Sequence, residues 1–299
     1  MIGNLSSIMM LVAPILITAT GGMICERSGV VNVGLEGLFS IGACTAAIMH
    51  RQLEVAGSGR ISIFIAIVCG ALVAGIISLI HGLAAIDLKA DQTISGTGIN
   101  LLADGITVFV CQRFYGTDRS KEFILGMIKD KIGFYPSFYI SIAVIVIAWF
   151  LLYKTPFGMH LRACGEHPSA ADSCGINVRR TRYIGVLSSG LLAGLAGGCA
   201  VLTQTIQFTS SFTNGRGFIA LAAVAFGRWT PLGVFGAALL FGASLALATI
   251  SSMVPALKAV PSQVFNIIPY LVTLIALIAF SGRDYAPKSS GIPYEKGAS

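Results

Sequence analysis

Long apolar runs separated by short charged stretches repeat from one end of the chain to the other. A helix needs about 20 mostly apolar residues to cross a hydrocarbon core about 30 Å thick. The runs predict about nine helical segments, over 1–25, 37–49, 61–80, 97–111, 138–153, 183–203, 217–227, 232–253 and 264–281. We expect the first to be a span and not a cleaved signal peptide, because no basic residue precedes it and Arg27 follows it.

Two of these runs, 37–49 and 217–227, are too short to cross a membrane unaided. Asp104 also interrupts the run over 97–111. Non-helical backbone at membrane depth is stable only where protein buries it or where it lines a cavity, so such segments indicate a transport pathway. The pattern therefore predicts an all-α, polytopic helical membrane protein of about 8–10 transmembrane segments, some broken or re-entrant.

One short pattern occurs in both halves of the chain. Residues 96–103 and 215–222 share GxG followed by an apolar residue and, after two further positions, Leu-Ala. Matched glycine-interrupted segments are typical of transporters built from internal repeats. The alternative is chance recurrence in a chain that holds 35 glycines.

Basic residues suggest an orientation. The stretches 113–131 and 154–182 each hold five Lys or Arg. Cytoplasmic loops of membrane proteins are enriched in these residues. We predict that 154–182 and the polar tail 283–299 are cytoplasmic, which with nine crossings places the N-terminus outside. Residues 1–282 then form the transmembrane domain.

Composition agrees with a membrane location and excludes several classes. The chain is 55% hydrophobic and 11% charged, against about 25% charged in an ordinary soluble domain. Its net charge of +7 does not indicate nucleic acid, because the basic residues lie between apolar runs. The seven cysteines form no CxxC pair, and the four histidines show no metal-ligand spacing. We expect no metal, no nucleophile–base pair and no enzyme.

The most informative polar segment is 162–177, which we call the coupling segment. Pro168 suits the first turn of a helix and Gly175 suits its exit, so the segment predicts a helix of about two turns. On these grounds alone the helix is either an incidental loop helix or a knob that inserts into a partner.

The pattern GE-x-P-x-AA-D-x-x-GI-N after a basic residue resembles the segment by which permeases of ATP-binding-cassette (ABC) importers dock on their ATPase. Residues 26–37 and 215–233 are similar to permeases of the branched-chain amino acid, ribose and nucleoside importer superfamily, the first most of all to its nucleoside or simple-sugar branch. The resemblance implies that the ATPase is contacted by Arg162, Gly165, Glu166, Pro168, Ala170, Ala171, Asp172 and Gly175.

The resemblance also implies partners and an activity. They are a second, homologous permease in a heterodimer, a cytoplasmic ATPase that uses ATP and Mg²⁺, an extracytoplasmic substrate-binding lipoprotein and the lipid of a bacterial cytoplasmic membrane. The expected activity is import of nucleosides or a related ribosyl compound by alternating access. Simple sugars or riboflavin are the alternative cargo, and an ion-coupled secondary transporter is a less favoured class. The chain has no GxxxxGK[ST] loop, so it should not hydrolyse ATP itself.

Polar residues at membrane depth are candidates for the substrate pathway. They are Asn32, Glu36, Asn100, Asp104, Gln204 and Asn214. Helix–helix hydrogen bonds and an aqueous loop are the alternatives for these side chains. Arg27 could pair with Glu36 or Glu26 near them. Gly190, Gly194 and Gly198 recur every fourth residue, which predicts close helix packing within the chain or across a permease dimer.

Overall fold

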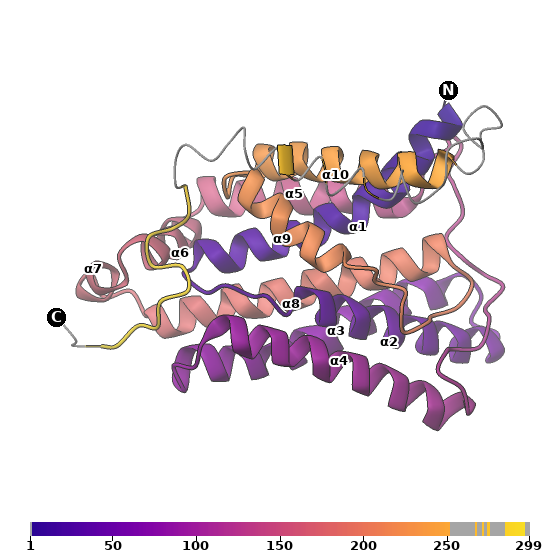
Figure 1. Cartoon of the computed structure of the whole chain (residues 1–299), viewed down its shortest axis with the longest axis horizontal. Coiled ribbons are helices and arrows are strands. Elements are labelled where there is room, and N and C mark those ends of the chain that lie inside the picture. Colours follow the sequence, from indigo (N-terminus) through magenta and orange to yellow (C-terminus); the bar gives the residue numbers. More distant parts are fainter. Residues whose placement is uncertain (1, 252–266, 268–270, 272–273, 276–284, 297–299) are drawn as a thin grey trace.

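The computed structural model of the chain describes residues 2–251, 267, 271, 274–275 and 285–296 (Figure 1). The predicted span over 264–281 and the predicted boundary at 282 lie almost wholly outside the described residues. The described elements are α1 (Ile2–Arg27), α2 (Leu35–Val55), α3 (Ile61–Gly82) with a π-helical extension η1 (Leu83–Asp87), α4 (Gln92–Tyr115), α5 (Pro136–Lys154), α6 (Pro156–Glu166), α7 (Pro168–Ser173), α8 (Val178–Gln204), α9 (Arg216–Phe226) and α10 (Pro231–Ser251).

The predicted fold class is confirmed, since the described residues form helices and no strand. Five of the helices are long and apolar enough to cross a membrane. They cover Leu5–Arg27, Ile61–Asp87, Gln92–Tyr115, Pro136–Lys154 and Val178–Gln204. The chain is therefore a multi-pass membrane protein.

Local sequence explains where several helices begin and end. The Asp91 side chain accepts hydrogen bonds from the first turn of α4, and Gly116, with φ of +72°, ends that helix. Proline occupies the first position of α5, α6 and α7, where its missing N–H costs nothing. Asn177 caps α8 by accepting a hydrogen bond from the Arg180 N–H.

Helix α8 lies inside the bundle and packs against α1, α2 and α3 (Figure 1). Glycine permits this close approach. A Cβ added at Gly42 of α2 would lie 2.3 Å from the Gly194 Cα, and one added at Gly190 would lie 2.3 Å from the Ser78 Oγ of α3. The three glycines at 190, 194 and 198 thus face α3 within this chain. We call this glycine-packed contact of α2, α3 and α8 the glycine core.

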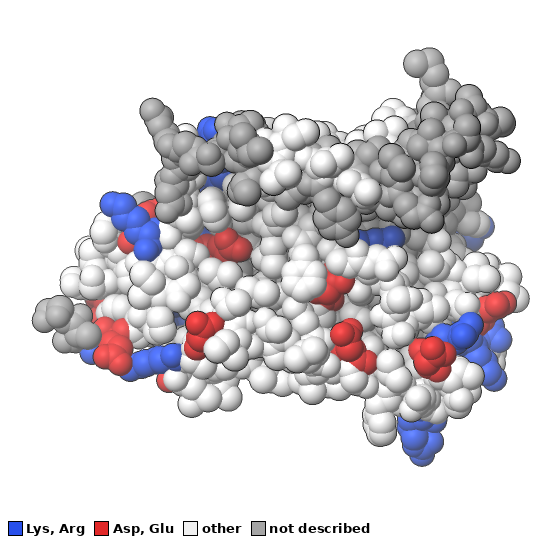
Figure 2. Space-filling view, viewed as in Figure 1, with Lys and Arg blue, Asp and Glu red and all other residues white. Residues whose placement is uncertain are grey.

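The two ends of the bundle differ in content. The N-terminus and the connection over 116–135 lie at one end, whereas α6, α7 and the tail residues 285–296 lie at the other (Figure 1). The Gln204 Nε2 donates to the Met10 carbonyl at 3.0 Å, so α1 and α8 are antiparallel. Lys and Arg gather mainly at the two ends in Figure 2, and the middle is mostly uncharged apart from a few acidic side chains.

Two predicted features of the spans are wrong. Helix α2 is not a short run over 37–49 but a continuous helix of 21 residues. It continues because the ring of His50 is buried, with its nitrogens 2.5 Å from the Leu125 carbonyl and 3.0 Å from the Ser62 hydroxyl. Helix α4 also runs unbroken past Asp104, whose side chain is exposed on its outer side. Helix α9 is short, with 11 residues, as the run over 217–227 predicted.

Candidate functional site

The non-helical segment 28–34 lies inside the bundle between α1 and α2. Five of its seven residues are buried, and α2 begins near the middle of the bundle rather than at its end (Figure 1). Residues 205–215 likewise bring the chain back inward before α9 begins (Figure 1). We call residues 28–37, together with Asn100 and Gly215–Gly217, the central junction.

Side-chain amides satisfy the backbone at the start of α2. The buried Asn32 donates from Nδ2 to the Ser189 hydroxyl at 2.7 Å and accepts the Gly34 N–H at 3.0 Å. From α4, Asn100 accepts the Gly37 N–H at 2.8 Å and donates to the Val33 carbonyl at 3.1 Å. Buried backbone groups need such partners, so these two amides hold the segment in place without a helix.

Glu36 connects α2 to α9. Its carboxylate accepts the Gly215 N–H at 2.8 Å and the Gly217 N–H at 2.5 Å, both at the N-terminus of α9. A negative charge there also complements the positive end of the helix dipole. Gly215 has φ of +77°, a left-handed conformation that glycine adopts without strain.

Both GxG stretches pack against the start of α2, although their local structures differ. A Cβ added at Gly96, in the second turn of the continuous α4, would lie 2.8 Å from the Gly34 nitrogen. One added at Gly217, in the first turn of α9, would lie 2.4 Å from the Glu36 Cα. The glycines of the two stretches therefore let α4 and α9 both pack closely against the start of α2.

The six candidate pathway residues fall into three groups. Asn32, Glu36 and Asn100 meet at the central junction, and the exposed Asn214 immediately precedes it with φ of +45°. Asp104 lies one turn beyond Asn100, on the exposed side of α4. Gln204 lies at the far end of α8, bound to α1.

Arg216 is a junction residue for which the sequence offered no role. Its Nη1 is buried, and no described residue bonds to it. Its guanidinium lies over the Phe212 ring, 5.0 Å from the centroid, beside the Glu36 carboxylate. The signal that could have identified Arg216 was a charged residue between the two glycines of the GxG pattern, at the start of an apolar run.

A second polar cluster lies where α1 ends. The Arg27 Nε donates to the Trp229 carbonyl at 2.9 Å, and the Trp229 indole donates to the Glu26 carboxylate at 2.5 Å. Among the described residues, the ion pair of Arg27 is with Glu166, at 3.9 Å. The expected pairing of Arg27 with Glu36 or Glu26 is therefore wrong, because α1 ends beside α6.

The turn from α9 to α10 is strained at this cluster. Arg228 and Trp229 have φ of +53° and +52°, a region that bulky side chains rarely adopt. Such residues cost about 1–3 kcal/mol each and persist only where their surroundings hold them. Backbone hydrogen bonds within the turn, such as that from the Trp229 N–H to the Val224 carbonyl at 3.2 Å, hold its shape. The bonds of Trp229 to Glu26 and Arg27 tie it to the end of α1.

The coupling segment contains the end of α6 and all of α7, at the same end of the bundle. Ala171 is buried, whereas Ala170 is exposed beside it. Gly165 packs on the end of α1, where an added Cβ would lie 2.3 Å from the Arg27 carbonyl oxygen. The Arg162 guanidinium covers the Tyr153 ring at 4.8 Å. The segment is thus fixed to α1 at Gly165 and exposes a small side chain at Ala170.

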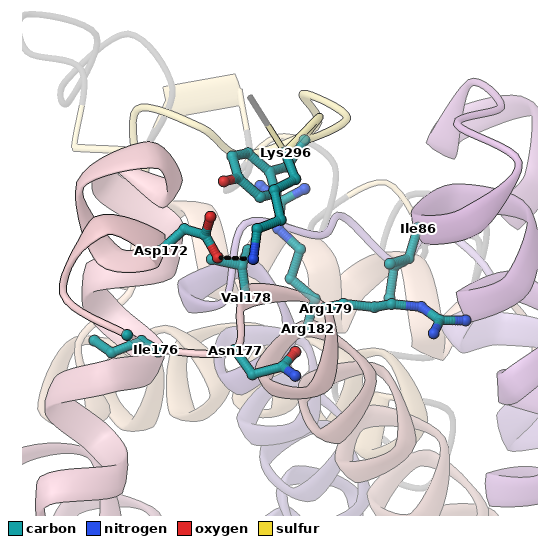
Figure 3. Close-up of a pocket in the computed structure, with 10 residues that line it drawn as sticks. Ile86, Asp172, Ile176, Asn177, Val178, Arg179, Arg182 and Lys296 are labelled. Carbon is teal, nitrogen blue, oxygen red and sulfur yellow. Dashed lines mark ion pairs between the residues drawn. The ribbon is translucent and has the colours of Figure 1, made fainter. Parts of the chain in front are cut away.

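The tail residues 285–296 lie across this segment. A cavity of about 430 Å³ lies between α7, the start of α8 and the tail. Figure 3 shows side chains that line it. Across it, Lys296 pairs with Asp172 at 3.5 Å, and the buried Arg182 donates to the Ile292 carbonyl at 3.0 Å. Lys89 pairs with Glu295 and lowers the pKa of that carboxyl. Together these contacts hold the tail against the helices.

The described residues contain no cluster of His, Cys, Asp and Glu that could hold a metal ion. The chemistry available at the central junction is hydrogen bonding, and at the α7 end it is surface contact.

Comparison with known proteins identifies the family. Residues 4–277 match the family described as the permease component of branched-chain amino acid transport systems. The chain belongs to this family. No solved structure matches it.

Several curated relatives align with the permease over most of its length. It is 46% identical to the guanosine ABC transporter permease NupQ of Bacillus subtilis, over 95% of this chain and 94% of that one. It is 38% identical to the nucleoside ABC transporter permease NupC of Lactococcus lactis, over 95% and 93%. A putative glucose ABC transporter permease of Haloferax volcanii, TsgC13, is 31% identical over 80% and 75%. The predicted class is confirmed: the chain is a transport subunit of an ABC transporter and not an enzyme.

Proposed function

We propose that this permease imports nucleosides through the bacterial cytoplasmic membrane by alternating access. The observation that carries the substrate class is its 46% identity, over 95% of the chain, to a permease named for guanosine. The relative named for nucleosides is also more similar to it than the one named for glucose. The α7 end faces the cytoplasm in this proposal, and the N-terminus faces outward.

The working assembly is a heterodimer of permeases with a cytoplasmic ATPase and a substrate-binding lipoprotein. Bacillus subtilis has two guanosine permeases related to this chain, NupQ at 46% and NupP at 25% identity, which supports a pair of unlike subunits. ATP and Mg²⁺ are bound by the ATPase.

Helix α7 is the contact that receives the movement of the ATPase. With six residues it buries little area in its own chain, and its exposed side carries Ser169, Ala170 and Ser173. Small side chains there let the helix enter a groove, while the buried Ala171 secures its base. The other residues that the resemblance assigns to the ATPase contact lie in α6, in α7 and in the turn that follows α7.

The exposed side of α4 and the central junction line the pathway in this proposal. Asp104 lies in an apolar span and is exposed in the single chain. Contact of a carboxylate with lipid costs about 2.5–3.5 kcal/mol at the centre of a bilayer. A position between two permeases, where water and sugar hydroxyls are available as partners, removes that cost.

The decisive experiment is nucleoside uptake into vesicles that contain both permeases, the ATPase and the lipoprotein. We expect Ala170→Asp to reduce uptake at least about tenfold, because a buried charge at the docking contact costs more than 1.4 kcal/mol. Because Ala170 is exposed in the single chain, membrane insertion and the yield of the permease should not change. Cys174→Ser, also exposed and at the end of α7, is the matched control and should retain uptake.

Two results would contradict the proposal. If Ala170→Asp supports uptake at the rate of the control variant, α7 is not the docking contact. Uptake that proceeds without ATP and stops with an ionophore would identify an ion-coupled transporter instead. Competition of labelled guanosine by adenosine, glucose or riboflavin then assigns the substrate class.

A further inference from the structure

The end of α1 joins three parts of the permease that are far apart in the sequence. The coupling segment approaches it so closely that Gly165 leaves no room for a side chain beside the Arg27 carbonyl. On its other side the turn from α9 to α10 is bound through Trp229. The chain leaves the end of α1 directly into the non-helical segment 28–34.

Helix α9 connects this end of the bundle to the central junction. Its first turn is held by Glu36, and its last turn leads into the strained residues Arg228 and Trp229. Its 11 residues form one short, unbroken helix, which is able to pass a displacement from one end to the other as a rigid unit. A displacement of the Trp229 turn therefore reaches the Glu36 contact at the other end of the helix.

The contacts at Trp229 have the geometry of a linkage. The indole donates to Glu26 and the carbonyl accepts from Arg27, so two consecutive residues of α1 hold one residue of the turn from both sides. The neighbouring Arg228 guanidinium lies over the Tyr285 ring of the tail, 4.5 Å from its centroid. The turn also keeps backbone hydrogen bonds of its own, such as that from the Arg228 N–H to the Ala225 carbonyl at 3.0 Å, so the contacts with α1 set its position rather than its shape.

We propose that Trp229, held by Glu26 and Arg27, is the positioning residue that transmits movement of the coupling segment through α9 to the central junction. This rests on the proposed function, in which α7 receives that movement. Without the indole bond, the turn after α9 is less firmly attached to α1 and no longer follows the movement of α6. ATP hydrolysis then continues, while the Glu36 junction no longer follows it.

The test compares nucleoside uptake with ATP hydrolysis in the complete reconstituted complex. Trp229→Phe keeps an aromatic ring and removes the N–H donor. We expect assembly and ATP hydrolysis to stay within about twofold of the unmodified complex, while nucleoside transported per ATP falls about tenfold. Trp149→Phe, on α5 and outside the cluster, is the matched control and should keep the unmodified ratio.

A second variant separates the hydrogen bond from the charge. Glu26→Gln still offers an amide oxygen to the indole, so we expect its ratio to stay within about threefold of the unmodified value. A loss as large as that of Trp229→Phe would overturn the role of the indole bond. If Trp229→Phe lowers the yield of assembled complex, Arg27→Lys tests the other bond of the same linkage, because lysine keeps the charge and cannot reach both the Trp229 carbonyl and Glu166. Its transport-to-ATP ratio should also fall, and an unmodified ratio would overturn the linkage.

Failure of this inference and failure of the proposed function give different results. A normal transport-to-ATP ratio in Trp229→Phe, with uptake lost in Ala170→Asp, overturns the linkage alone. Normal uptake in both variants overturns the docking role of α7 and the linkage together. A parallel fall of ATP hydrolysis and uptake in Trp229→Phe shows a structural role and also overturns the linkage.

Discussion

The glycine core and the central junction hold their helices together by opposite means. In the glycine core, helical backbones satisfy their own hydrogen bonds and lie in direct contact, as Gly42 and Gly194 do. At the central junction the backbone leaves the helix, and side chains such as Glu36 and Asn100 complete its hydrogen bonds.

This difference separates rigidity from adjustment. Backbones in direct contact at glycines leave no empty space between the helices, so a shift of one helix of the glycine core must shift the others. Hydrogen bonds made by side chains exchange for others when a neighbouring helix shifts, because each bond is worth only about 0.5–1.5 kcal/mol net. The glycine core is therefore the more rigid contact, and the central junction is held by hydrogen bonds that side chains can exchange.

The largest expected effect is loss of folding when the glycine core is overfilled. Gly42→Ala places a methyl group 2.3 Å from the Gly194 Cα, and overpacking of this kind costs about 1–3 kcal/mol. We expect the yield of monodisperse protein on size exclusion to fall several-fold. Gly236→Ala on α10, where an added Cβ meets nothing within 4 Å, should keep the yield. Equal yields from both variants would show that the glycine core is not rigid.

A smaller loss of stability with a large loss of transport is expected at Glu36. Glu36→Ala removes the acceptor for two N–H groups of α9, which costs about 0.5–2 kcal/mol of stability as an N-cap does. We expect uptake to fall about tenfold or more because α9 loses its hold on α2.

The same helix offers the control for Glu36. Near the other end of α2, the Glu54 carboxylate accepts the Ile124 and Leu125 N–H groups at 2.9 and 2.7 Å. Glu54→Ala should lower the melting temperature by a similar amount and leave uptake within about threefold. Equal losses of uptake in the two variants would contradict a special role for the central junction.

The smallest expected effects distinguish two residues one turn apart on α4. Asn100→Ala removes two hydrogen bonds to the start of α2, so we expect both the melting temperature and uptake to fall. Asp104→Ala removes an exposed carboxylate, so we expect unchanged melting and uptake reduced about threefold. Thermal melting and uptake on the same samples measure this. A fall in melting temperature for Asp104→Ala would make it a packing residue.

Much of the architecture was predictable from local pattern. The long apolar runs predicted α1, α3, α5 and α8 within a few residues, because burial in lipid requires continuous apolar length. The short run at 217–227 predicted the short helix α9, because its apolar residues continue for only about three turns. The continuous α2 was not predictable, because the polar residues that extend it are satisfied by distant partners, as His50 is by Leu125.

The candidate site was predictable in part. Asn32, Glu36 and Asn100 stood out as polar residues at membrane depth, and the structure brings them to one point. Their partners did not stand out, since Glu36 and Gly215 are 179 positions apart. The same holds for Arg27 and Trp229, which are 202 positions apart.

The amino-acid sequence by itself determined the membrane location, the helical class and the resemblance to ABC importer permeases. These follow from hydrophobic run length and from contiguous motifs, which need no knowledge of packing. Only the tertiary structure decided that Glu36 holds α9, that Arg27 meets Trp229 and Glu166, and that Ala170 is exposed while Ala171 is buried. The physical reason is that hydrogen-bond partners and burial are set by how helices from distant parts of the chain pack, and local pattern does not contain that information.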